Sequence, residues 1–106
     1  LLPLGGRTAL RLWHEADDEF VIVVSGEVVM RDDHGEAVLC DSDCAGFRPG
    51  EANGHAFENR SDEPAVIFEI GSRSPDEIVH YPDDDLRLER RSNKRSWVRK
   101  DRTPYV

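Results

Sequence analysis

The sequence predicts an all-β domain, either a sandwich or a barrel. Short segments of strand-forming residues recur at regular spacing up to residue 70, and turn-forming residues separate them. No helical period of apolar residues occurs before residue 72. With 106 residues, the chain has the size of one domain with a modest hydrophobic core.

The first two expected strands, residues 8–14 and 19–24, differ in how they are covered. Residues 8–14 alternate between two faces, and the mostly apolar face ends in His14. The second strand begins with Glu19 and is apolar on both faces after it. This pattern predicts a central strand that is buried on both sides.

Five further strands are expected, each bounded by turn residues. Ser25-Gly26 is typical of a tight turn, residues 32–35 of a hairpin turn in which Gly35 supplies the positive φ, and Pro49-Gly50 of a longer loop. Pro64 stands at the start of a strand, where its missing N–H does no harm. These strands cover residues 27–31, 36–39, 44–47, 54–59 and 65–70.

The composition changes beyond residue 71. Residues 72–86 are rich in Pro and Asp and are expected to form a loop that packs on the barrel. Residues 87–106 are expected to form an extended basic C-terminal tail that is partly ordered at best. The predicted organisation is a single domain with its barrel core in residues 1–71.

The net charge of −8 is unevenly distributed along the chain. Residues 87–106 carry eight Lys or Arg and two acidic residues, a net +6, which leaves −14 for residues 1–86. The acidic body should repel nucleic acid and anionic membranes, so neither is expected as a partner. The basic tail is expected to lie in solvent against this body or a neighbouring subunit, and contact with a polyanion is the alternative.

The sequence favours a cytoplasmic protein. No apolar run approaches the roughly 20 residues that span a bilayer, and no secretion signal is recognisable. Cys40 and Cys44, separated by three residues, do not match a zinc-binding pattern. They are expected to remain small buried thiols, with a disulfide as the less favoured alternative.

Three residues far apart in the sequence suggest a metal site. In a closed sheet alternate residues point inward, so His14, Glu19 and His55 can converge near one mouth of the barrel. Imidazole nitrogen and carboxylate oxygen suit Zn, Fe, Mn or Ni, and three protein ligands leave room for water or substrate. The alternative is a pair of surface histidines and a solvated glutamate.

The same residues form part of a longer motif. The pattern G-x5-H-x-H-x3,4-E-x6-G is matched by Gly6, His14, Glu19 and Gly26, with Leu12 in place of the first histidine. On this motif the chain resembles the cupin superfamily.

A second cupin motif, G-x5-P-x-G-x2-H-x3-N, is matched more loosely by Gly50, His55 and Asn59, with a longer loop between glycine and histidine. The resemblance extends over residues 2–86 and is closest to a group of small cupins, some of which carry a sugar-phosphate isomerase label.

The resemblance implies a jelly-roll β-barrel, also called a double-stranded β-helix, with a divalent transition metal held by four side chains. Carried over by position, three of these ligands are His14, Glu19 and His55, and the fourth place is Leu12, which cannot ligate. The result is either a site with three protein ligands and an extra water or a site that stays empty.

Several other residues are candidates for a substrate pocket. Arg48 and Asn59 could hold an anionic substrate, and Phe57 could line an apolar cavity together with Val21 and Phe68. In this fold the apolar members could equally be plain core.

Three functions remain open at this stage. The first is a metal-dependent enzyme that acts on a small polar molecule, for example by aldose–ketose isomerisation, with Glu19 as the base if no metal is bound. The second is a metal-free cupin that binds or senses a ligand without catalysis, which Leu12 favours. The third is an Fe(II)-dependent dioxygenase that uses the same three ligands. A homodimer through barrel-edge strands is expected from the resemblance.

Overall fold

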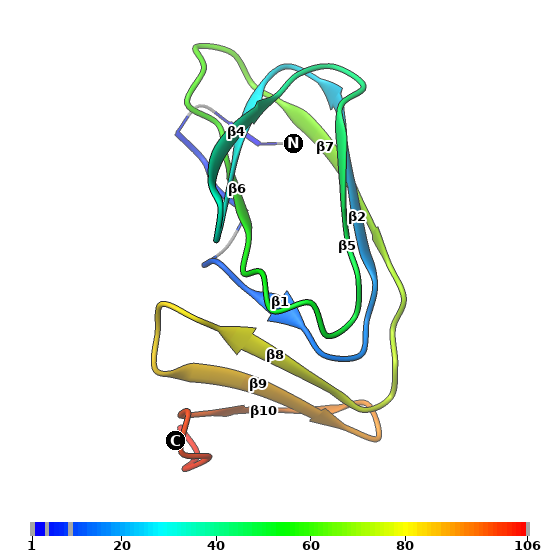
Figure 1. Cartoon of the computed structure of the whole chain (residues 1–106), viewed down its shortest axis with the longest axis vertical. Helices are drawn as coiled ribbons and strands as arrows, with labels where there is room; N and C mark the ends of the chain where they lie inside the picture. The colour runs from blue at the N-terminus through cyan, green and yellow to red at the C-terminus, as the bar shows by residue number, and fades with distance from the viewer. Residues whose placement is uncertain (1, 4, 9, 106) are drawn as a thin grey trace.

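The computed structural model describes residues 2–3, 5–8 and 10–105, and it confirms the all-β prediction. These residues form ten strands and no helix, so none of them belongs to a helix able to cross a membrane. Figure 1 shows the chain as a barrel-like body with a further sheet at one end. The strands are β1 (Trp13–His14), β2 (Glu19–Ser25), β3 (Val28–Asp32), β4 (Gly35–Leu39), β5 (Cys44–Phe47), β6 (Ala56–Glu58), β7 (Val66–Gly71), β8 (Glu77–Tyr81), β9 (Leu86–Arg91) and β10 (Lys94–Val98).

Two antiparallel three-stranded sheets, β5–β2–β7 and β4–β3–β6, face each other and form the barrel (Figure 1). Their inward side chains make the main core because alternate residues of each strand point between the sheets. Val21 and Val23 of β2, Val28 of β3 and Phe57 of β6 are among its buried members. A tight turn at Gly26 connects β2 to β3, where φ is +91° and a side chain would meet the Ala65 backbone.

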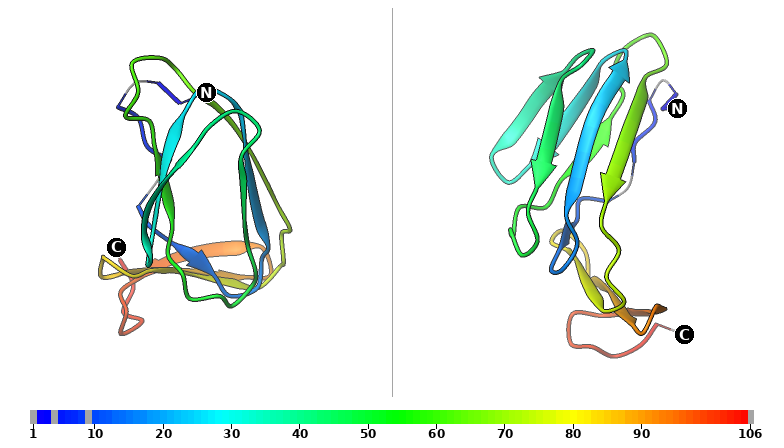
Figure 2. Two further views of the ribbon diagram at one scale, coloured as in Figure 1. Left: turned by 45° about the horizontal axis from the view of Figure 1, so that its top comes forward. Right: turned by 90° about the vertical axis from the view of Figure 1, so that its right-hand side faces the viewer.

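The third sheet has the order β1–β8–β9–β10 and lies across one end of the barrel, as both views of Figure 2 show. It has a core of its own, in which Val79, Tyr81 and Leu88 are buried and Leu12 and Leu86 pack against them. The short strand β1 therefore belongs to this C-terminal sheet by its pairing.

The structure differs from the sequence expectation after residue 71. The expected loop over residues 72–86 contains β8, and the expected basic tail over residues 87–106 contains the hairpin β9–β10, in which all five residues of β10 pair with β9. Residues Ser92 and Asn93 form its turn, both with positive φ (50° and 66°). The sequence does not show the usual alternation of apolar and polar residues in these strands, because charged residues, Glu77 and Arg90, occupy buried positions. The proposed division of the chain at residues 71 and 86 remains a prediction about domain organisation.

The first expected strand, residues 8–14, is regular only at Trp13–His14. Upstream, isolated bridges join Arg7 to Glu58 and Leu12 to His55, and position 9 lies outside the described residues. This segment therefore runs beside β6 without forming a continuous ladder.

The central strand β2 is covered on one face only, and not on both faces as expected. Val21 and Val23 are fully buried, whereas Phe20 and Val24 are 40% and 55% exposed, because none of the strands in the described part of the chain covers the outer face of β5–β2–β7. The two cysteines, which flank the turn into β5, are free and exposed rather than buried.

Candidate metal centre

The structure brings His14, Glu19 and His55 together where the barrel meets the C-terminal sheet. His14 ends β1, Glu19 begins β2, and His55 directly precedes β6. Glu19 lies between the two rings: its Oε1 contacts Nε2 of His55, and its Oε2 is 3.7 Å from Nε2 of His14. Two imidazoles and one carboxylate from three strands thus meet as a single group.

The backbone and neighbouring side chains hold His55 in place. Leu12 and His55 exchange both backbone hydrogen bonds, at 3.1 and 3.0 Å, and the imidazole stacks on the ring of Phe47. Its Nδ1 lies 3.0 Å from the carbonyl oxygen of Asn53, to which it donates. Nε2 faces Glu19, whose carboxylate can only accept a hydrogen bond. In a neutral ring with its proton on Nδ1, the lone pair of Nε2 would be free for a metal in place of that hydrogen bond.

The charges in this group stabilise one another. Burial alone would raise the pKa of Glu19, but the neighbouring rings of His14 and His55 outweigh it and lower that pKa to about 2. The carboxylate of Glu19, 3.7 Å from Nε2, raises the pKa of His14 above its ordinary value, against the opposing effect of burial. In the metal-free protein Glu19 is therefore ionised, and His14 holds a proton more readily than usual.

A cavity of about 80 Å³ opens beside Glu19 and His55. Leu12 lines it, so the side chain that replaces the histidine of the motif faces the same space as two of the three remaining candidate ligands, Glu19 and His55; His14 lines the neighbouring cavity of about 370 Å³. Phe57, a predicted pocket residue, also lines it and is 2% exposed. The remaining lining residues are Thr8, Leu10 and Glu69.

Glu69 is a second carboxylate in this region that the sequence analysis did not select. It lies in β7 opposite Val21 of β2, which places it on the inner face of the sheet. It lines the 80 Å³ cavity and two larger ones, of about 370 and 430 Å³. The residue is exposed, but partial desolvation of its carboxyl group, and then the charge of Glu19, raise its pKa. One feature of the sequence could have identified Glu69: it is the one acidic residue within the apolar run 65–70.

Two other predicted pocket residues lie elsewhere. Asn59 is fully buried; its Nδ2 donates to the carbonyls of Leu2 and Glu63, and its Oδ1 accepts from Ser61. It holds neighbouring loops together and lines none of the three cavities. Arg48 is exposed and also lines none of them.

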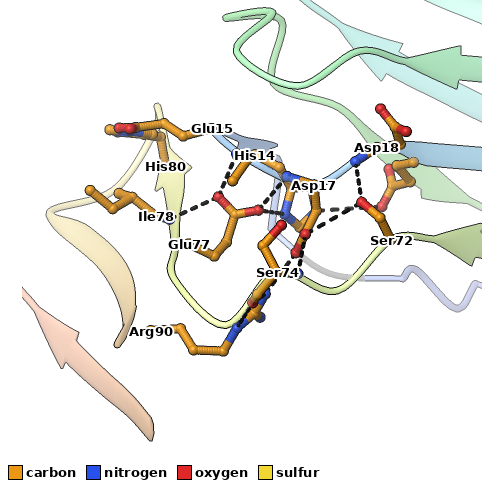
Figure 3. Close-up of polar contacts among 12 residues, drawn as sticks. His14, Glu15, Asp17, Asp18, Ser72, Ser74, Glu77, Ile78, His80 and Arg90 are labelled. Atoms are coloured by element: carbon orange, nitrogen blue, oxygen red, sulfur yellow. Dashed lines mark hydrogen bonds and ion pairs between the residues drawn. The ribbon is translucent and has the colours of Figure 1, made fainter. Parts of the chain in front are cut away.

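A second group of potential ligands lies on the other side of the His14 ring (Figure 3). Ligand atoms of His14, Asp17 and Glu77 all lie within 4.8 Å of one another. Asp17 is paired with the buried Arg90, whose Nη2 donates to its Oδ2 at 2.8 Å. A cation in this outer group would have to compete with the guanidinium of Arg90.

The inner group has the donor types that suit a divalent transition metal, but its ligand atoms, unlike those of the outer group, do not all lie within 4.8 Å of one another. Its donors are two imidazoles and one carboxylate, the set that leaves coordination positions open in metalloenzymes. Both imidazoles have an oxygen atom facing Nδ1, from Asn53 for His55 and from Glu77 for His14, so both rings direct Nε2 at Glu19. Histidine ligands are commonly oriented in this way.

Comparison with known proteins gives one family and several similar structures. The family model described as "Cupin domain" matches residues 1–71. A crystal structure of a sugar phosphate isomerase from a cupin superfamily, from Silicibacter pomeroyi, is 39% identical with a TM-score of 0.94, and the match covers 99% of this chain and 67% of that one. Among curated proteins, none matches the chain.

Two more distant structures show the fold alone. A protein from Acidithiobacillus ferrooxidans, named as a candidate sugar phosphate isomerase, is 24% identical with a TM-score of 0.87 over 98% of this chain and 66% of its own. A predicted oxalate decarboxylase from Thermotoga maritima is 23% identical with a TM-score of 0.59 over 66% of this chain and 58% of its own. The chain thus spans about two thirds of the length of the two relatives that also share its C-terminal sheet.

Proposed function

Because the chain belongs to the cupin family, we propose that it is a metal-dependent isomerase of a small polar substrate, with phosphorylated sugars as the substrate class. One observation carries this proposal: Glu19 lies between Nε2 of His14 and Nε2 of His55, beside a cavity that a second carboxylate, Glu69, also lines. The name of the relative from Silicibacter pomeroyi supports the substrate class.

His14, Glu19 and His55 would hold the metal, which is Zn, Fe, Mn or Ni by the chemistry of the ligands. A divalent cation there would polarise a carbonyl or hydroxyl oxygen of the substrate. Glu19 is suited to bind it because its low pKa keeps the carboxylate charged at neutral pH. Protons compete for His14, whose raised pKa makes metal binding weaker in acid.

Glu69 would move the proton that isomerisation requires. In an aldose–ketose interconversion one proton leaves C2 and is returned to C1, while the hydroxyl proton passes from O2 to O1. Glu69 is exposed as a residue, yet partial desolvation of its carboxyl group raises its pKa, and a raised pKa makes the carboxylate a stronger base for the transfer at carbon. Glu19 and Glu69 therefore have different roles because their pKa values move in opposite directions.

The test combines metal analysis with an assay on aldose and ketose phosphates in D2O, where NMR reports both turnover and exchange of the transferred proton. We expect about one bound transition metal per chain and measurable isomerisation. Glu69→Gln should lower kcat by roughly 10²–10⁴-fold and leave the metal bound. The exposed Glu51, replaced by Gln, is the matched control and should retain full activity.

The alternative is a metal-free cupin that binds a ligand, and Leu12 favours it because an apolar side chain lines the cavity at a motif position. Protein that acquires no metal on soaking and isomerises none of the sugar phosphates would exclude the enzyme and leave this binding module. Turnover that needs dioxygen and iron would instead point to the dioxygenase.

A homodimer is part of the same proposal. Large apolar side chains on the outer face of β5–β2–β7 support it: Phe20 and Val24 of β2, and Phe68 and Ile70 of β7, are exposed. Phe68→Glu should yield monomers when mass in solution is measured by light scattering. Val38→Glu, at an equally exposed site on the other barrel sheet, should leave the mass unchanged.

A further inference from the structure

His14 is held by a different part of the fold from the other two candidate ligands. Its strand β1 pairs with β8, with Trp13 opposite His80 and His14 opposite Val79. Glu19 begins a barrel strand, and the residue after His55 begins another. The placement of one imidazole in the site therefore depends on the C-terminal sheet, beyond the part of the chain that the family model matches.

Glu77, the first residue of β8, faces Nδ1 of His14, the ring nitrogen that points away from Glu19. Its side chain is 1% exposed, and its Oε2 lies 3.6 Å from Nδ1 of His14 (Figure 3). Nδ1 of His14 is buried and has no hydrogen-bond partner among the described residues, while Nε2 is 3.7 Å from Glu19. The ring thus stands between two carboxylates, with one nitrogen directed at each.

Backbone hydrogen bonds fix Glu77 itself. Its Oε1 accepts from the backbone N–H of Ala16 and of Ile78, each at 2.8 Å, and its Oε2 accepts from that of Asp17 at 2.7 Å. The carboxylate therefore sets the path of the turn that leads from His14 to Glu19. A small closure of the 3.6 Å gap would add Nδ1–H of His14 as a further donor.

Asp17 and Arg90 hold the same turn from the other side. Asp17 accepts from the backbone N–H of Ser74 at 2.7 Å and from Nη2 of Arg90 at 2.8 Å. Nε of Arg90 also donates to the carbonyl oxygen of Ser74 at 2.8 Å. Asp17 is thus already neutralised by a buried cation, so this outer group acts as a support for His14 rather than as a cation site of its own.

We propose that Glu77 is a positioning residue: it holds Nδ1–H of His14 and thereby presents Nε2 to the metal site formed with Glu19 and His55. The inference rests on the proposed metal site, and it assigns the C-terminal sheet a role in that site. Glu77 does not touch the reacting atoms, and its effect reaches them through the orientation and tautomer of one imidazole.

The first measurement uses the wild-type protein. Long-range ¹H–¹⁵N correlation spectra of the metal-free and Zn²⁺-loaded protein report which nitrogen of His14 carries a proton. We expect a protected Nδ1–H in both states, with Nε2 on zinc in the loaded state. A loaded state in which Nε2 keeps its proton would overturn the proposal, because zinc would then bind the outer group.

The second measurement compares two variants with wild type by Zn²⁺ titration, on samples whose spectra show that they are folded. Glu77→Gln should weaken zinc binding about 10–100-fold and abolish the protected Nδ1–H signal. Asp17→Asn disturbs the same turn and leaves Glu77 in place, so it should lower thermal stability and keep zinc affinity close to that of wild type. Equal losses of affinity in both variants would overturn the proposal.

The two proposals fail in distinguishable ways. If wild-type protein shows the protected Nδ1–H of His14 but binds no transition metal, the proposed function fails and the contact with Glu77 stands. If wild type binds zinc and Glu77→Gln binds it equally well, the positioning role fails and the metal site stands.

Discussion

The two polar groups on either side of the His14 ring differ in how fully their hydrogen bonds are satisfied. On the outer side, both oxygens of Asp17 and both oxygens of Glu77 accept hydrogen bonds, and Arg90 neutralises Asp17. On the inner side, Glu19 meets only imidazoles, and a cavity opens beside it. The outer group has the properties of a structural support, and the inner group those of a binding site.

The difference is also electrostatic. The two neighbouring imidazoles hold the pKa of Glu19 at about 2, yet its side chain remains 18% exposed at the edge of the cavity. A ligand can therefore reach Glu19, whereas the side chains of Asp17 and Arg90 are each 7% exposed and already paired. The two groups therefore differ mainly in how far a ligand can reach their carboxylates, and less in how many acidic residues they contain.

The largest expected effect comes from breaking the outer group. Arg90→Met leaves the carboxylate of Asp17 buried without its cation, which should lower the free energy of unfolding by about 3–5 kcal/mol. Urea denaturation of the metal-free protein measures it. Arg60→Met removes a pair with Glu36 in which both side chains are exposed, and it should change the free energy of unfolding far less. Equal losses in the two variants would mean that the outer group is not a specific support.

The next effect concerns the inner group and appears in metal affinity. His55→Gln removes a proposed ligand and should weaken Zn²⁺ binding by at least about 100-fold, more than loss of an orienting partner does. Isothermal titration checks this value. His34→Gln, in an exposed hairpin turn, is the matched control and should bind as wild type does. Unchanged affinity in His55→Gln would place the ion outside the inner group.

The pH dependence of stability should separate the two groups without any metal. The lowered pKa of Glu19 stabilises the fold above its ordinary value of 4.5, and this contribution is lost as the pH falls toward 2. The raised pKa of His14 stabilises the fold below its ordinary value of 6.5, and this contribution is lost as the pH rises through the raised value.

The His14–Glu19 pair should therefore contribute most between about pH 4.5 and 6.5. The expected amplitude is on the order of 2 kcal/mol or less because the carboxylate is partly open to solvent. Denaturation of wild type and Glu19→Gln across this range measures the difference between the two curves. A difference that does not vary with pH would refute the assignment of the two shifts.

The smallest expected effect restores the missing histidine of the motif. Leu12→His places an imidazole in the cavity lined by Glu19 and His55 and should tighten Zn²⁺ binding about tenfold, the size of one modest ligand contribution. Leu86→His removes a leucine from the same second core without lining that cavity, so it controls for lost packing. If both variants bind Zn²⁺ more tightly, or neither does, Leu12 does not occupy a ligand position of the metal site.

Much of the barrel was predictable because its strands alternate between apolar inward residues and other outward residues, with turn residues between them. Glu19 to Leu39 is the clearest case: both the expected hairpin and its strands occur. The pattern fails after residue 71 because Glu77 and Arg90 hold positions that apolar residues usually fill. A buried charged residue indicates a strand only when the residue that pairs with it is known. Arg90 pairs with Asp17, 73 positions away in the sequence.

The candidate site was predictable to a similar degree. The motif spacing selected His14, Glu19 and His55, and the structure places each of the two histidines beside Glu19. Glu69 and Glu77 could not be chosen on the same basis, because their importance depends on how strands pair across the sheets. The exposed outer face of β2 was also missed, since periodicity describes how apolar residues alternate but not whether a second layer covers them.

The pairing of β1 with β8 has a consequence for how the protein is made. His14 emerges from the ribosome before β8 has been synthesised, so the nascent barrel still lacks the strand that pairs with β1. A contact between segments so distant in sequence forms late and slowly. Assembly of the site should therefore be among the last events of folding, after synthesis has passed Tyr81, and a truncated translation product should be unable to complete it.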